Sequence, residues 1–141
     1  MRIRERHLFI AMSATSQLVT ASHNAGVDYQ SPAQKTHSCT ALSFQVKWSG
    51  ASFAGTFAVE ASNDQATGLG RDQPTNFSAV ELISGSAVVT SIAVSGIGQS
   101  PMLLKVVDPG AAFHRLTFVH GLASTGSLDS VTYIGQERFG G

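Results

Sequence analysis

The chain contains one cysteine, Cys39, and this scarcity limits both its redox chemistry and its metal chemistry. A single cysteine cannot form a disulfide within the chain, and it cannot supply the paired cysteines of a structural zinc site. A reactive thiol would need a neighbouring base, and the sequence identifies none. We therefore expect Cys39 to be a small buried residue.

Charged residues are also scarce. Asp, Glu, Lys and Arg make up 13% of the 141 residues, about half of the share usual in a soluble domain, and the net charge is zero. A neutral chain has no long-range attraction to nucleic acid, so we expect no nucleic-acid partner. A surface with so few charges is poorly suited to a free soluble protein. The composition therefore indicates that neighbouring subunits cover much of the surface.

Long apolar runs are absent, and no segment approaches the roughly 18 to 20 residues that a membrane helix needs. The N-terminus faintly resembles a signal peptide, because a basic start precedes an apolar stretch from Leu8 to Met12. That stretch is shorter than the usual apolar core of about 7 to 15 residues, and Glu5 lies in the basic region. We expect this segment to be retained, and we expect no membrane partner.

The sequence motifs of common enzymes are missing. The chain lacks the Gly-x-Ser-x-Gly sequence of serine hydrolases, and the glycines at 96 and 98 lack the Lys and the helix of a phosphate-binding loop. His114 and His120 lie on one face of a predicted strand, but at about 3.3 Å per residue they are about 20 Å apart. Carboxylates are sparse. We expect a protein without enzymatic activity and without a cofactor.

Two groups of residues have the chemistry of metal ligands. His37 and Cys39 are two positions apart, but no second pair accompanies them. Asn63, Asp64 and Asp72 border a loop and offer oxygen ligands for calcium, but the spacing of an EF-hand is absent. Asn and Asp are also common turn residues. We favour the turn interpretation and expect no metal site.

Apolar residues occupy every second position at 42–48 and again at 57–61. This period of two is typical of strands with one buried face. A glycine-containing connection at 49–55 joins the two segments. The pattern predicts a β-hairpin whose apolar side carries Trp48 and Phe57.

Five further strands are predicted between turn signals, at residues 77–83, 88–94, 102–106, 113–119 and 128–134. Short strands with a turn every ten or so residues are typical of a β-sandwich or a jelly roll. No stretch has the pattern of an ordinary helix. We predict an all-β fold with a single antiparallel β-sandwich or jelly-roll-like domain at residues 41–141.

Residues 1–40 have too few large apolar side chains to fold alone. We predict that they form an extended N-terminal arm with a short first strand at 18–21. Residues 1–12 have two interpretations: a frayed end or start-site artefact, or a segment that binds a neighbouring subunit. Arg offers planar, multi-donor contacts, and apolar residues offer an anchor. The second interpretation predicts a partner-binding set of Arg2, Arg4, Arg6, Leu8, Phe9 and Ile10.

Aromatic residues also allow two interpretations. Trp48, with Phe44 and Phe57, has the chemistry of a sugar-stacking platform. Each of these residues, however, shares its alternation face with Leu, Val and other apolar residues, which is typical of a core. We favour the core interpretation.

Two segments resemble a group of small structural proteins of tailed-phage particles: FQVKWSGASFAGTFAVEASND at 44–64 and FHRLTFVHGLASTGSLDSVTYI at 113–134. The shared pattern is a strand ending in Trp and Gly, then Gly-Thr-Phe, an SND turn, a late strand with an Arg, and a Ser/Thr-Gly hairpin. The matching residues are Trp48, Gly50, Gly55, Thr56, Phe57, Ser62, Asn63, Asp64, Arg115, Thr125, Gly126 and Leu128. The chain departs from the pattern at 65–77, which lacks the usual Trp, and residues 1–40 match nothing.

The resemblance implies a structural component of a phage particle. A small, weakly charged sandwich with a long leading arm suits a protein that sits on a larger lattice. We therefore expect a capsid decoration, or cement, protein that binds the major capsid protein on the outer surface of the virion, as a symmetric homo-oligomer. A neck, tail or baseplate component is the second hypothesis. A carbohydrate-binding module for host attachment is the third.

Overall fold

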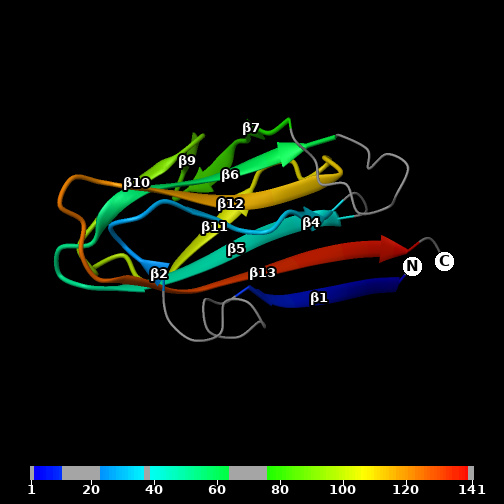
Figure 1. Cartoon of the computed structure of the whole chain (residues 1–141). Helices are drawn as coiled ribbons and strands as arrows, with labels where there is room; N and C mark the ends of the chain where they lie inside the picture. Colours follow the sequence, from blue (N-terminus) through cyan, green and yellow to red (C-terminus); the bar gives the residue numbers. More distant parts are fainter. Residues whose placement is uncertain (1, 11–22, 37–38, 64–75, 140–141) are drawn as a thin grey trace, which may run out of the picture.

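The computed structural model describes residues 2–10, 23–36, 39–63 and 76–139, with the backbone alone described at 2–10 and 137–139. These residues form strands and no helix, and the strands make two antiparallel sheets that pack face to face (Figure 1). The predicted all-β sandwich is confirmed. The predicted strand at 18–21 lies outside the described residues. The division into an arm at 1–40 and a sandwich at 41–141 stays a prediction.

The first sheet, which we call sheet A, has seven strands. Its order is β1 (Arg2–Ile10), β13 (Ser127–Phe139), β5 (Cys39–Ser49), β11 (Met102–Val106), β8 (Leu82–Ser84) and β9 (Ala87–Val89), and β2 (His23–Asn24) also pairs with β13. The long strands β13 and β5 form its centre. Their register places Tyr133 opposite Phe44, and the two rings stack with centroids 5.6 Å apart.

The second sheet, sheet B, has six strands. Its order is β10 (Ile92–Ser95), β6 (Ala54–Ser62), β12 (Phe113–His120) and β3 (Tyr29–Gln30), while β4 (Gln34–Lys35) also pairs with β12 and β7 (Ser78–Ala79) with β6. The short strand β2 belongs to sheet A, and β3 and β4 belong to sheet B. Residues 23–36 therefore contribute to the sandwich.

The predicted hairpin between residues 42 and 64 is wrong, because β5 and β6 lie in different sheets. β5 pairs with β13 and β11, whereas β6 pairs with β12 and β10. The connection at 50–53 crosses from one layer to the other. Both strands still bury the predicted apolar faces, including Trp48 and Phe57. Alternation identifies the buried face of a strand, but it does not identify the neighbouring strand.

Two other predicted strands are each divided between the sheets. Residues 77–83 contain β7 of sheet B and the start of β8 of sheet A, and residues 88–94 contain the end of β9 of sheet A and most of β10 of sheet B. Val88 is consequently 56% exposed, although the pattern placed it on one face with the buried Val94. Crossing between sheets interrupts the alternation without a glycine or proline to mark the break.

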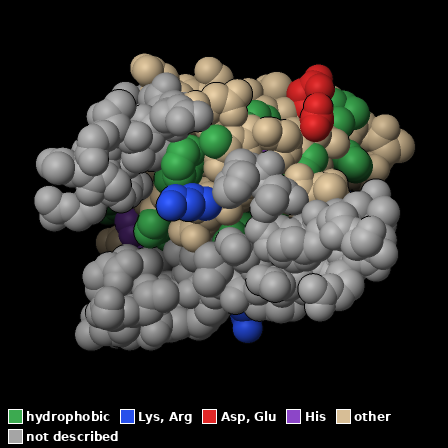
Figure 2. Space-filling model, turned by 90° about the vertical axis from the view of Figure 1, so that its right-hand side faces the viewer, with side chains coloured by type: hydrophobic (Ala, Val, Ile, Leu, Met, Phe, Trp, Pro, Cys, Tyr) green, Lys and Arg blue, Asp and Glu red, His purple; other side chains and the backbone are tan. Residues whose placement is uncertain are grey.

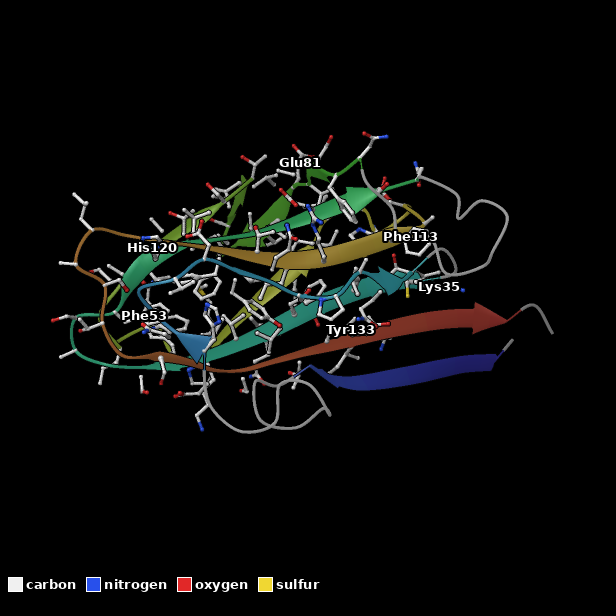
Figure 3. The ribbon with its side chains drawn as sticks, in the orientation of Figure 1. Lys35, Phe53, Glu81, Phe113, His120 and Tyr133 are labelled. Carbon is white, nitrogen blue, oxygen red and sulfur yellow. The ribbon has the colours of Figure 1, made fainter. Side chains whose placement is uncertain are left out.

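An aromatic cluster fills the core where the chain crosses from β5 to β6. Trp48, Phe53, Phe57 and Phe118 are buried, with ring centroids 5.0–6.3 Å apart. Phe53 lies at the left end of the sandwich in Figure 3. The indole Nε1 of Trp48 donates to the carbonyl of Gly96 at 2.6 Å, so the ring is also satisfied as a polar group.

Three residues of the phage resemblance, Gly50, Gly126 and Leu128, have structural roles at this end of the sandwich. Leu128 is buried and lies opposite Trp48 in the register of β13 and β5. Gly50 and Gly126 have φ of 118° and 98°, and a side chain on Gly126 would collide with the backbone of Ser49. Only glycine fits two backbones this close at positive φ. These motif residues therefore specify the fold.

We expect Gly55→Ala to destabilise the protein by about 1 to 3 kcal/mol, the usual cost of overpacking. A Cβ at this position in β6 would lie 2.6 Å from the Val119 carbonyl oxygen and would also collide with the Phe118 ring. Gly98→Ala is the matched control, since nothing lies within 4 Å of its added Cβ. Urea unfolding of both variants measures the difference. Equal stability of the two variants would contradict this packing.

Candidate interaction surface

The outer face of sheet B carries an ion pair between neighbouring strands. Arg115 of β12 lies opposite Glu60 of β6, and its Nε and Nη2 contact Glu60 Oε1 at 2.8 and 2.7 Å. The guanidinium also lies 3.7 Å from the centroid of the Phe77 ring. Arg115, which belongs to the phage resemblance, is therefore held on its own sheet by a carboxylate and an aromatic ring.

A carboxylate–histidine pair lies at the far end of β12. Asp28 Oδ1 accepts hydrogen bonds from the His120 backbone N–H at 3.0 Å and from its Nδ1 at 2.6 Å. The backbone hydrogen bond, followed by the side-chain one, lowers the pKa of Asp28. Both side chains are well exposed, at 59% and 44%. The pair fastens the loop before β3 to the end of β12.

A shallow hollow of about 390 Å³ runs between these two side-chain pairs along sheet B, lined by Asp28, Tyr29, Gln30, Glu60, Thr117, Phe118 and Val119. Its two carboxylates, Glu60 and Asp28, do not converge. Glu60 lies opposite Arg115, whereas Asp28 contacts His120. His120 is five positions further along β12 than Arg115, or about 17 Å away. Each carboxylate of this hollow accepts hydrogen bonds from a neighbouring Arg or His, so the arrangement links segments of the sheet.

His114 is a fully buried histidine at the other end of β12. Its Nδ1 lies 2.6 Å from Thr36 Oγ1, and that hydroxyl donates to the carbonyl of Ala111. The threonine proton is thus in use, so Nδ1–H donates and Nε2 carries the lone pair. Nε2 has no partner in the described part of the chain. Burial lowers the pKa of His114 to about 4.

Of the predicted metal ligands, the structure describes Cys39 and Asn63, and among the described residues no group of three or more His, Cys, Asp and Glu side chains could hold an ion. Asn63 Oδ1 accepts the backbone N–H of Ala112 at 2.8 Å, so this side chain links the end of β6 to the segment before β12. Cys39 is buried, as predicted. His37, Asp64 and Asp72 lie outside the described residues.

Within the described residues, no helix has the length and apolarity to cross a membrane.

The sugar-stacking platform does not exist as a surface. Trp48 is 3% exposed, and Phe44 and Phe57 are 0% exposed. The core interpretation of these residues is confirmed.

The outer face of sheet A carries apolar side chains, a feature that the sequence analysis missed. Strand register places five residues in one row across the sheet, Ile134, Ser43, Lys105, Ile83 and Val88 in that order. Ile134, Ile83 and Val88 are 36%, 41% and 56% exposed. Lys105 lies between them and forms no ion pair with any described residue.

Two more apolar side chains extend this surface. Leu103 and Val107 are 47% and 40% exposed, and they alternate with the buried Leu104 and Val106. A groove of about 540 Å³ lies on the same face, lined by Thr40, Ala41, Leu42, Ser43, Ile83, Lys105, Val106, Val107, Pro109, Ile134 and Gln136. We call Ile83, Val88, Leu103, Lys105, Val107 and Ile134 the A-face. Residues 102–104 and 106–107 are all apolar. Because successive residues of a strand point to opposite faces, this run indicates that both faces of β11 are apolar.

Charge is sparse elsewhere on the surface too. Figure 2, which views the right-hand end of the molecule in Figure 1, shows a few scattered charged side chains among neutral and apolar ones of the described residues. This agrees with the low charge content of the sequence.

The predicted partner-binding residues at the N-terminus lie in β1, which pairs with β13 from Arg2 opposite Phe139 to Ile10 opposite Val131. β1 is the border strand of sheet A (Figure 1). At 2–10 the predicted extended arm is therefore a strand of sheet A. Arg occupies every second position at 2, 4 and 6, a period of two that is typical of a strand.

Comparisons with known proteins show the fold. The crystal structure of SPBc2 prophage-derived protein YomS superposes with a TM-score of 0.58 at 11% identity, over 97% of this chain and 96% of that one. No family model and no curated protein matches the sequence. The two chains thus share one architecture over nearly their whole lengths.

We expect stability to fall as pH falls through the range set by His114. Its pKa is about 4 in the folded protein, against an ordinary value of 6.5, so protons bind the unfolded chain first. The His114 contribution is present above pH 6.5, and about 3 kcal/mol of it is lost by pH 4. Denaturant unfolding at pH 7 and pH 4 measures the loss.

His114→Asn is the comparison variant, because the amide keeps a donor for Thr36 and does not titrate. Its loss of stability between the two pH values should be smaller by about 3 kcal/mol. An equal loss in both proteins would contradict the assignment of a neutral buried imidazole.

Proposed function

We propose that this chain is a non-enzymatic structural protein of a tailed-phage particle, and that it is a capsid decoration protein bound to the major capsid protein on the outer surface of the virion. The observation that carries the proposal is the A-face. It places apolar side chains in a regular pattern on a sheet face that nothing in the described chain covers. Exposed apolar surface of this kind marks an interface.

Each apolar side chain of the A-face costs free energy in contact with water and gains about 25 cal/mol for every Å² that a partner covers. A flat sheet presents these side chains together, so one partner surface covers several of them. Lys105, at the centre of the A-face, has no ion-pair partner among the described residues, and an acidic side chain of the bound protein would satisfy it.

The phage origin of the structural neighbour and the motif resemblance support a place in a phage particle. Two side-chain pairs support a structural role, because Arg115 with Glu60 and Asp28 with His120 each link neighbouring segments. A neck, tail or baseplate component uses the same features and remains the alternative. Burial of Trp48, Phe44 and Phe57 argues against a carbohydrate-binding role, because these rings cannot stack on a sugar.

The stoichiometry of the chain in purified particles separates the two virion roles. A decoration protein is present in hundreds of copies, whereas a neck, tail or baseplate component is present in a small multiple of three or six. Quantitative mass spectrometry against the major capsid protein measures the ratio. We expect the larger number, and absence of the chain from particles would contradict a virion role.

Leu103→Glu should reduce occupancy on particles at least tenfold, since it places a charge in the A-face without disturbing the core. Val119→Glu is the matched control, because Val119 is a similarly exposed apolar residue (54%) on the outer face of sheet B. Both variants should melt within a few degrees of the parent. Titration of particles that lack the protein measures occupancy. Equal binding of the two variants would contradict the A-face as the docking surface.

A further inference from the structure

The borders of the two sheets differ greatly in length. β9, β10, β7, β3 and β4 have three, four, two, two and two residues. β1 has nine, and it pairs with β13 over all nine positions without a register shift. Short border strands are one way in which proteins prevent edge-to-edge association. β1 lacks that protection.

The free side of β1 has unused hydrogen-bonding capacity. In an antiparallel pair, the backbone groups of successive residues point alternately toward the neighbouring strand and away from it. Half of the N–H and C=O groups of β1 therefore point away from β13. Within the described residues, no strand pairs with this side. Another strand placed there would satisfy these groups, as in strand addition to an open sheet.

We propose that β1 pairs with β1 of a second copy of this chain, antiparallel and about a two-fold axis at Arg6, so that the two A sheets become one continuous sheet. This inference names the interface of the symmetric homo-oligomer that the sequence predicts, and it does not depend on the virion role. β1 lies at the lower border of the described fold in Figure 1.

The register follows from length and symmetry. A two-fold axis perpendicular to the sheet pairs residues of equal parity, and full overlap of Arg2–Ile10 centres the pair on Arg6. Glu5 then lies opposite His7 of the second copy, and Ile3 lies opposite its Phe9. Each of these pairs occurs twice, and such cross-strand pairs stabilise sheets. If one β1 is shifted by two residues along the other, toward the N-terminus, Arg4 of each copy lies opposite Arg6 of the other. That register places two pairs of like charges side by side.

The pairing carries one electrostatic cost. Arg6 faces Arg6 across the axis, and the three arginines and one glutamate of β1 leave each strand with two positive charges. Repulsion between exposed charges is screened by salt, with a Debye length of about 10 Å at 0.1 M. Association should therefore strengthen at least severalfold between 0.05 and 0.5 M NaCl. An interface built on attraction of the arginines to an acidic partner would weaken instead.

Disulfide trapping tests the register. In a Cys39→Ala background, R6C should form a covalent dimer on mild oxidation, because the two copies of position 6 face each other across the axis. I10C is the matched control in the same strand. Residue 10 lies opposite residue 2 of the second copy and about 27 Å from its own counterpart, so it should not cross-link.

Sedimentation of the unmodified purified chain gives an independent measurement, since it needs no variant to fold. We expect a dimer at micromolar concentration in 0.5 M NaCl. A monomer under these conditions would overturn the proposal. So would an oligomer that does not cross-link at residue 6, or that cross-links equally at residue 10.

These experiments use the purified chain without particles, so they fail separately from the proposed function. A monomer that still occupies phage particles would overturn only the β1 interface. A dimer that is absent from particles would overturn only the virion role.

Discussion

The structure depends on the contact between its two sheets at the crossing from β5 to β6. Trp48 projects from sheet A, Phe57 and Phe118 project from sheet B, and Phe53 of the crossing itself lies between them. These four rings bury a large share of the apolar area that holds such a domain together. The crossing is possible because Gly50 and Gly126 let two backbones approach more closely than any side chain would allow. Without this contact, each sheet would expose its apolar inner face.

The sequence predicts faces well and pairings poorly, and β5 shows why. Its alternation identifies Leu42, Phe44, Val46 and Trp48 as buried, because burial on one face is a local property with a period of two. Its partner β13 lies some 80 residues away, and no local pattern encodes that distance. The nearest strand in sequence, β6, was therefore assigned as its neighbour.

The A-face was missed for a related reason: exposed apolar residues such as Leu103 resemble core residues until the direction of each face is known. β1 was missed because its alternation is carried by arginine.

Two outward-facing features distinguish this chain from a self-sufficient sandwich. The A-face exposes apolar side chains on one layer, and β1 leaves a long border open on the same sheet within the described part of the chain. The outer face of sheet B instead carries the Arg115–Glu60 and Asp28–His120 pairs beside the exposed Val119, and its border strands are short. Association would thus be concentrated on sheet A. A continuous sheet formed through β1 would also double the A-face, so two weak contacts with a lattice would act together as a stronger one.

Hydroxyl-radical footprinting of the free chain and of the chain on phage particles tests the central claim most directly, because oxidation reports the exposure of individual side chains. The account predicts that Ile83, Leu103 and Val107 lose most of their reactivity on the particle, whereas Val119 of sheet B retains its own. Unchanged reactivity of the A-face, or protection confined to sheet B, would contradict the account.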